Sequence, residues 1–187
     1  MKTWMIVLIV IGVILLMLGG WFIGNFNKVM ALDQGVAEAW AQVENQLQRR
    51  NDLIPNLVNT VKGYAAHEKE LFIKVTELRS QWQKAQTKGE KIQAAEGLGG
   101  VLSRLLLVAE NYPELKANQN FLSLQAQLEG TENRIAVERN RYNRTVRVYN
   151  TYVQNIPGAF FAGLRGKKPT EFFEAEAAAK AVPKVQF

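Results

Sequence analysis

The chain has 187 residues, with 23 Lys+Arg against 17 Asp+Glu, and it contains no cysteine. The formal net charge of +6 favours an anionic neighbour, either a membrane surface or a nucleic acid. Without cysteine, the chain can form no disulfide, thiolate metal site, redox thiol or cysteine nucleophile. About 25 residues have the composition of a membrane segment, which leaves roughly 160 for one compact soluble domain.

Residues 1–27 predict a transmembrane anchor. The run from Thr3 to Gly24 carries no charge, and at 1.5 Å per residue it spans roughly 30 Å of hydrocarbon. Trp4 and Trp21 lie near its ends, where aromatic rings prefer the headgroup level. A cleavable signal peptide is the alternative, but the run exceeds the usual apolar region of about 7–15 residues. We therefore expect an uncleaved single-pass anchor.

Two features of the anchor concern its packing against other membrane helices and its orientation in the membrane. Gly20 and Gly24 form a G-x-x-x-G pattern, which favours close packing of membrane helices, although glycine is also simply common in such helices. The few flanking cations, Lys2 and Lys28, leave both orientations open and slightly favour an N-terminus inside and a soluble domain outside, in the periplasm.

Residues 28–156 predict an all-α domain. Apolar residues recur in steps of three and four through residues 36–82, as on one face of a helix. A second helical region follows "TKGE" and closes at Pro113, and a third runs from about Gln119 to Gln154. Long helices joined by short polar turns predict an antiparallel bundle of three or four helices.

Residues 157–187 form a tail with a different composition. Thr170 is predicted to cap a short latch helix that begins at Glu171 and stops at Pro183. The tail either folds back on the bundle through its phenylalanines or docks on anionic lipid or a partner protein. The candidate residues are Phe160, Phe161, Arg165, Lys167, Lys168, Phe172 and Phe173.

No catalytic, cofactor or metal site is expected. His67 is the only histidine, and a zinc or iron site needs several converging ligands. Glu68 and Glu70 are two residues apart, so on a helix they do not face each other. "GLGG" at residues 97–100 lies inside a helical pattern, which argues against a phosphate-binding loop. We therefore expect no enzyme.

A basic and aromatic stretch of the third helical region could in principle contact nucleic acid. Its five arginines alternate with Tyr142 and Tyr149. The tyrosines, however, continue the apolar stripe of that helix, so we interpret them as core residues. We expect no nucleic-acid partner.

A polar block interrupts the stripe in "RRNDLIPNL", where Arg49, Arg50, Asp52 and Pro55 are predicted to have a structural role that sets helix register. Arg50 falls at an inward-facing position, where an unpaired charge costs several kcal/mol. Its acid should come from a facing helix, and the candidates are Glu132 and Glu138. Pro55 should kink the helix or restart it, with Asn51 or Asp52 as the new cap.

The motifs R-R-x-D-L-I-P-N-L, Y-P-x-L-K-A-x-x-x-F, R-x-x-Y-N-x-x-V-x-x-Y-N and F-x-x-x-E-A-A occur in that order over nearly the whole chain. Together they resemble the LemA family of bacterial membrane proteins. The resemblance implies a single-pass inner-membrane anchor followed by a bundle of long antiparallel helices, with no cofactor and no established reaction. Family members are linked with HtpX-type zinc metalloproteases, and one is a magnetosome membrane protein.

Two functions follow as expectations. The first is a homo-oligomeric scaffold, anchored in the lipid bilayer, that presents its bundle to membrane-associated partners such as an HtpX-type protease. The alternative is a helical protein that binds lipid or remodels the membrane.

Overall fold

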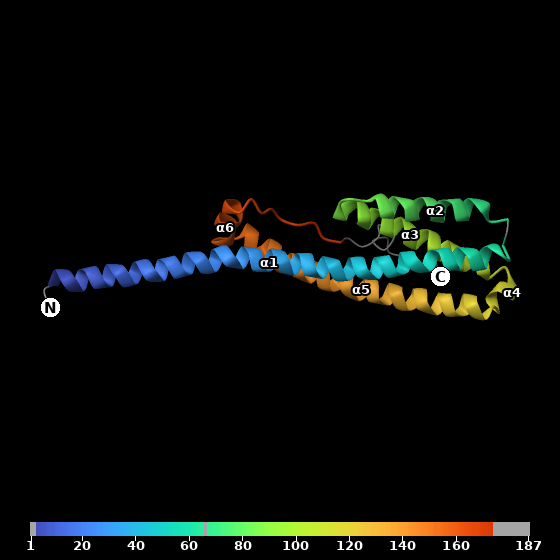
Figure 1. Cartoon of the computed structure of the whole chain (residues 1–187), viewed down its shortest axis with the longest axis horizontal. Coiled ribbons are helices and arrows are strands. Elements are labelled where there is room, and N and C mark those ends of the chain that lie inside the picture. Colours follow the sequence, from blue (N-terminus) through green and yellow to red (C-terminus); the bar gives the residue numbers. More distant parts are fainter. Residues whose placement is uncertain (1–2, 66, 174–187) are drawn as a thin grey trace, which may run out of the picture. The chain divides into compact units, whose positions relative to one another are not determined.

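A computed structural model describes residues 3–65 and 67–173 of the chain (Figure 1). Within these ranges the chain forms helices and connections and contains no strand, which confirms the all-α fold. The described residues cluster into two compact units. The first unit contains residues 3–40 and 141–172, and the second contains residues 41–140 and Phe173. The predicted domain boundaries at residues 27 and 156 stay predictions.

Helix α1 (Thr3–Lys62) continues through Pro55, so the predicted restart with a cap at Asn51 or Asp52 is wrong. Proline removes one backbone hydrogen bond from a helix interior. Here the residues around it, Ile54 and Leu57, are buried in the second unit. Their burial, at about 1.5–3 kcal/mol for each large apolar side chain, offsets the loss of that hydrogen bond.

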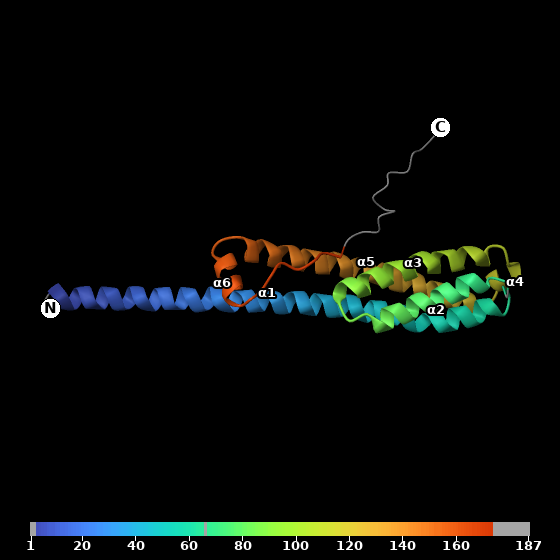
Figure 2. The same ribbon diagram turned by 90° about the horizontal axis from the view of Figure 1, so that it is seen from above.

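The second unit also contains α2 (Lys69–Lys84), α3 (Lys88–Ala109), α4 (Pro113–Lys116) and the first part of α5 (Gln119–Gln154). Both views show α2 and α3 side by side (Figures 1 and 2). The bounds of α5 are those predicted from its apolar stripe. The second predicted region ends earlier than expected, because α3 stops at Ala109 and Pro113 opens α4.

Helix starts in the second unit are set by polar side chains. At α3, the Thr87 hydroxyl accepts from the Glu90 N–H while the Glu90 carboxylate accepts from the N–H of Thr87 and of Gln86. Those backbone donors of Gln86 and Thr87 lower the pKa of Glu90. At α5, the side-chain Oδ1 of Asn118 accepts from the N–H of Asn120 and of Phe121.

The stripe that was predicted to run through residues 36–82 is interrupted between α1 and α2. Residues 63–65 and 67–68 lie between the two helices without being helical, and the Tyr64 hydroxyl accepts a hydrogen bond from Asn118 Nδ2 at 2.9 Å. On either side of this turn the apolar positions are buried as expected. The core of the second unit includes Val43, Leu47, Ile54, Leu57, Val61, Phe72, Val75, Leu98, Leu102, Leu105, Phe121, Leu128 and Ile135.

The first unit joins residues 3–40 of α1, the end of α5 and the short helix α6 (Gly158–Leu164). Its core contains Val29, Val36, Trp40, Tyr142, Val146, Tyr149, Val153 and Phe161. The Trp40 and Tyr142 rings meet edge to face with centroids 5.5 Å apart. The tyrosines are therefore core residues, as the stripe predicts.

After α6 the tail runs back along α5 without forming a helix up to Phe173. The Tyr142 hydroxyl donates to the Glu171 carbonyl at 3.0 Å, and the Tyr149 hydroxyl donates to the Lys168 carbonyl at 2.9 Å. The Asn150 amide exchanges two hydrogen bonds with the Thr170 backbone, each 2.8 Å long. The tail thus folds back on the helices, but the predicted helix does not begin at Glu171. The remainder of the predicted helix, up to Pro183, lies outside the described residues.

The tyrosines that hold the tail are kept neutral. Burial, and then the nearby Glu171 carboxylate, raise the pKa of Tyr142 to about 12. Burial also raises the pKa of Tyr149. Each phenol therefore remains a hydrogen-bond donor to a tail carbonyl well above neutral pH.

Candidate functional site

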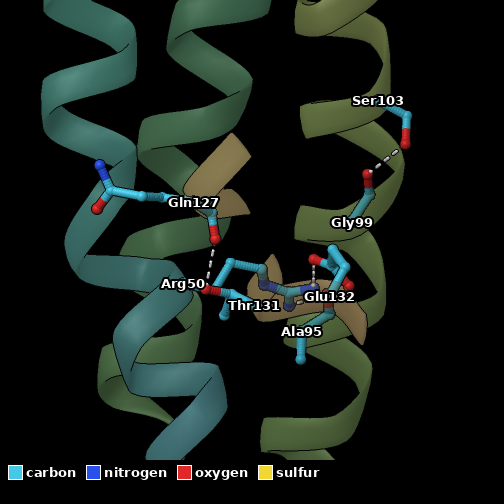
Figure 3. Close-up of polar contacts among 7 residues, drawn as sticks. All are labelled: Arg50, Ala95, Gly99, Ser103, Gln127, Thr131 and Glu132. Carbon is cyan, nitrogen blue, oxygen red and sulfur yellow. Dashed lines mark hydrogen bonds and ion pairs between the residues drawn. The ribbon is translucent and has the colours of Figure 1, made fainter. Parts of the chain in front are cut away.

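The predicted polar block contains a buried ion pair in the second unit. The Arg50 side chain, 5% exposed, donates from Nη1 to Glu132 Oε1 at 2.7 Å, and from Nη2 to the Ala95 carbonyl at 2.6 Å. Figure 3 shows the guanidinium between these two partners, which belong to α5 and α3. Arg50 on α1 is therefore joined to two other helices. Glu132 is one of the two acids that the sequence proposes for it.

The acid of this pair is partly in water. The Glu132 side chain is 47% exposed and lines an open groove together with Ser103, Leu106 and Glu129. Beside it, the buried Thr131 hydroxyl donates to the Gln127 carbonyl at 2.7 Å (Figure 3). In this groove Glu132 Oε1 is already bonded to Arg50, and the other side of the Glu132 carboxylate remains open to solvent.

The other members of the block do not join the pair. Arg49 and Asp52 are exposed, and Asp52 accepts a hydrogen bond from Gln48 Nε2 at 2.7 Å. Pro55 is half-buried inside α1. Of the four residues, Arg50 alone is buried, and its role in setting helix register stays a prediction.

Asn51 is a buried polar residue that the sequence analysis treated only as a cap. It is 1% exposed, and within the described part of the chain neither its Oδ1 nor its Nδ2 has a hydrogen-bond partner. Pro55, four residues on, has no N–H to offer the Asn51 backbone carbonyl. The signal in the sequence was an asparagine placed four residues before a proline, one step along from the apolar stripe.

This cluster offers charge pairing. His67 is exposed in the turn between α1 and α2. Among residues 3–65 and 67–173, no group of three His, Asp or Glu side chains could hold a metal ion. The chemistry available around Arg50 is recognition of a carboxylate and of a backbone carbonyl.

A second group of predicted residues lies at the end of the apolar run, in the first unit. The Phe161 ring lies 5.7 Å from the Trp21 ring and 5.0 Å from the Phe22 ring, both in edge-to-face contact. The Arg165 guanidinium stacks 3.6 Å from the Phe26 ring centre. We call these five residues the aromatic collar.

Tyr152 of α5 and a second cation, Lys28 of α1, lie beside the collar. The Tyr152 hydroxyl donates to Asn25 Oδ1 at 2.9 Å. The Lys28 ammonium lies 4.7 Å from the centre of the Tyr152 ring. Burial raises the pKa of Tyr152, which keeps its hydroxyl protonated. The backbones of Gly158 and Tyr152 lie so close together that a Cβ added at residue 158 would collide with the Tyr152 carbonyl oxygen.

The tail residues that were predicted as a docking edge separate into two classes. Phe161 is buried in the collar, Lys167 pairs with Asp33 at 2.6 Å, and Phe173 is buried 4.3 Å from the Arg139 guanidinium. Phe160, Lys168 and Phe172 are exposed. The first class explains why the tail folds back, and the second remains available for contact with another molecule.

The apolar run of α1 is open on all sides. Its large side chains from Trp4 to Ile23 are exposed, and an added Cβ at Gly20 or Gly24 meets nothing within 4 Å. Within residues 3–65 and 67–173, two helices are long and apolar enough to cross a membrane, α1 with 0% of its apolar window buried and α3 with 33%. The partial burial of α3 is typical of a core helix. Helix packing through Gly20 and Gly24 stays a prediction.

Comparison with known proteins places these features in a family. Residues 39–187 match the model of the LemA family. The chain is 24% identical over 180 residues to magnetosome protein MamQ 2 of Paramagnetospirillum magneticum and to MamQ of Magnetospirillum gryphiswaldense, with 82% of this chain and 66% of each relative covered. It is 21% identical over 133 residues to protein LemA of Metamycoplasma hominis, with 71% of this chain and 61% of that protein covered. The chain thus spans a little under two thirds of these relatives.

The two partners of the buried ion pair should respond differently to removal. Replacing Glu132 by Ala strands a buried guanidinium that keeps only the Ala95 carbonyl, and we expect a loss of about 3–5 kcal/mol in the free energy of unfolding. Replacing Arg50 by Met leaves a carboxylate that water can reach, so we expect a change within about 1.5 kcal/mol. Thermal or urea unfolding of the detergent-solubilised protein measures both changes.

The exposed pair Lys74–Glu77, 2.9 Å apart, is the matched control. Glu77→Ala should change the free energy of unfolding by less than about 1 kcal/mol. Equal losses for Glu132→Ala and Glu77→Ala would contradict a buried ion pair at Arg50.

Asn51 should be a site where the native residue lowers stability. Asn51→Leu replaces a buried amide without partners by an apolar side chain of similar size, and we expect a gain of about 1–3 kcal/mol in the free energy of unfolding. The exposed Asn56→Leu is the control and should be nearly neutral. A loss of stability in Asn51→Leu alone would show that the amide makes bonds that the leucine cannot replace.

Proposed function

The chain belongs to the LemA family, and we propose that it is a membrane-anchored interaction protein whose helices are presented to membrane-associated partners. The observation that carries the proposal is the charge-free run of α1, whose side chains are exposed although nearly all are apolar. Exposed apolar surface of this extent is unfavourable in water and favourable in hydrocarbon. Helix α1 begins with the anchor and continues without a break to Lys62.

The anchor also supplies a surface for self-assembly. Gly20 and Gly24 are open, and a small-residue pair four apart allows two helix backbones to approach closely in lipid. A homo-oligomer would display several copies of the helices, with their polar groove at Glu132, at the membrane. A membrane protease of the HtpX type is the partner class that the family resemblance implies.

The curated relatives support a role at membranes. The relatives from Paramagnetospirillum magneticum and Magnetospirillum gryphiswaldense are by name magnetosome proteins, and the family that the chain's motifs resemble is one of bacterial membrane proteins. We propose that this chain likewise acts at a membrane, by binding other proteins rather than by catalysis. Lipid binding outside the anchor is the second candidate, and the exposed Phe160 beside the collar favours it.

The anchor is tested by placing charge in the middle of the apolar run. In the double variant Val13→Arg/Leu16→Arg, each arginine at the bilayer centre costs about 2.5–3.5 kcal/mol on insertion. We expect most of the protein to leave the carbonate-washed membrane fraction. The control is Ile73→Arg/Val137→Arg, at two exposed apolar positions of the second unit, which should stay in the membrane. Retention of the Val13→Arg/Leu16→Arg protein in washed membranes would contradict the anchor.

Self-assembly is tested by particle mass in mild detergent. We expect a mass that is a multiple of the 21.1 kDa chain, and a lower multiple for Gly20→Leu/Gly24→Leu, because leucine keeps the helix backbones apart. Gly12→Leu, in the same apolar run, is the control and should keep the native mass. A mass of one chain for the native protein would remove self-assembly from the proposal.

A further inference from the structure

Helix α6 has two apolar sides, and only one of them is covered. Phe161 and Ala162 are buried at 1% and 2% exposure, and Phe161 contacts the collar rings. Phe160 and Leu164, four residues apart and so on one face of the helix, are 62% and 55% exposed. Ile156, in the turn before α6, is 93% exposed. We call Ile156, Phe160 and Leu164 the apolar foot.

Helix α6 lies against α1 where the apolar run of α1 ends, and this position indicates what the foot contacts. Its buried side packs on Trp21 and Phe22, the last aromatic residues of the charge-free run. The first polar side chain after these is Asn25, which Tyr152 binds, and the first cation is Lys28. The change from lipid-compatible to water-compatible sequence therefore falls at the level where α6 lies against α1 (Figure 2).

The unit that contains the foot carries cations whose charge is complementary to an anionic headgroup layer. Lys28, Arg165 and Lys168 belong to the same unit, and the first two stack on the rings of Tyr152 and Phe26. The neighbouring acid, Asp33, is paired with Lys167. Cations beside an apolar face are the composition of segments that lie in the interface of an anionic bilayer.

We propose that α6 is a second membrane contact, in which the apolar foot enters the boundary between the headgroups and the acyl chains beside the α1 anchor. Lipid is the occupant because the foot is continuous with the apolar run through the collar, and because its three side chains carry no hydrogen-bonding group. Phe161 holds α6 on α1, and Phe160 and Leu164 face the bilayer. This inference rests on the anchor of the proposed function.

The absence of cysteine from the chain makes a single-cysteine experiment direct. Full-length variants Ile156→Cys, Phe160→Cys and Leu164→Cys are spin-labelled and reconstituted into vesicles of phosphatidylethanolamine and phosphatidylglycerol. Collision of the label with oxygen, which concentrates in the bilayer, is compared with collision with a water-soluble nickel chelate. Leu16→Cys reports on the anchor, and Ile73→Cys is an exposed apolar control in the second unit.

We expect the oxygen-to-nickel ratio at the three foot positions to exceed that at residue 73 several-fold and to fall below that at residue 16. A high ratio at residue 16 with foot ratios equal to that at residue 73 would overturn the foot while leaving the anchor in place. A low ratio at residue 16 would overturn both. Foot labels shielded from oxygen and nickel alike would show that protein covers the foot, which would also overturn the lipid assignment.

Discussion

Helix α1 changes from a surface that is apolar on every side to a single buried stripe along one continuous run of backbone hydrogen bonds. In hydrocarbon a helix satisfies its backbone groups internally, so the side chains from Trp4 to Ile23 can be apolar on every side. In water the same helix needs a covered face, and from Val29 onward it buries a single stripe. The collar lies at the transition. There the Phe161 ring packs against one side of Trp21 and Phe22. These two residues are thus partly covered by protein where the apolar run ends.

The second unit contains the Arg50–Glu132 ion pair, whose two partners differ in their exposure to water. Arg50 is removed from water and keeps two partners, whereas Glu132 keeps one partner and much of its hydration. The desolvation penalty therefore falls on the guanidinium, whose fork of donors can reach a carboxylate and a carbonyl at once. Asn51, the next residue, is as deeply buried, yet its amide finds no such partners among the described residues. Two adjacent buried polar residues thus differ in their hydrogen bonding, since the Arg50 guanidinium has two partners and the Asn51 amide has none among the described residues.

Sequence periodicity predicted those parts of the fold in which local preference and packing agree. The stripe of α5 gave its bounds, and the inward position of Arg50 pointed to an acid on that helix. The turn after Lys62 was missed because Tyr64 and Leu71 are seven residues apart, so the helical phase continues across the break. A restart at Pro55 was one of two expectations, but burial of the surrounding stripe keeps α1 helical there; the kink stays a prediction.

Helix α6 was missed for a different reason. Its segment carries Pro157 and several glycines, which have low helix propensity, and its stability comes from contact with residues of α1 that are distant in sequence. The predicted latch helix after Thr170 drew on capping preference, which is local. In the described residues the tail is instead held by Tyr142, Tyr149 and Asn150, whose hydrogen bonds go to backbone carbonyls and so carry no sequence signature.

The family match begins at residue 39, after the apolar run and the α1 side of the collar, and it includes the Arg50 pair and α6. The physics of the two regions explains such a boundary. A helix surrounded by lipid is constrained in composition and length but hardly in the order of its residues. A buried guanidinium requires a particular acid on a particular helix, and α6 requires a residue without a Cβ where Gly158 meets the Tyr152 carbonyl. The family match therefore covers the part of this chain in which the contacts of the Arg50 pair and of Gly158 depend on residue identity.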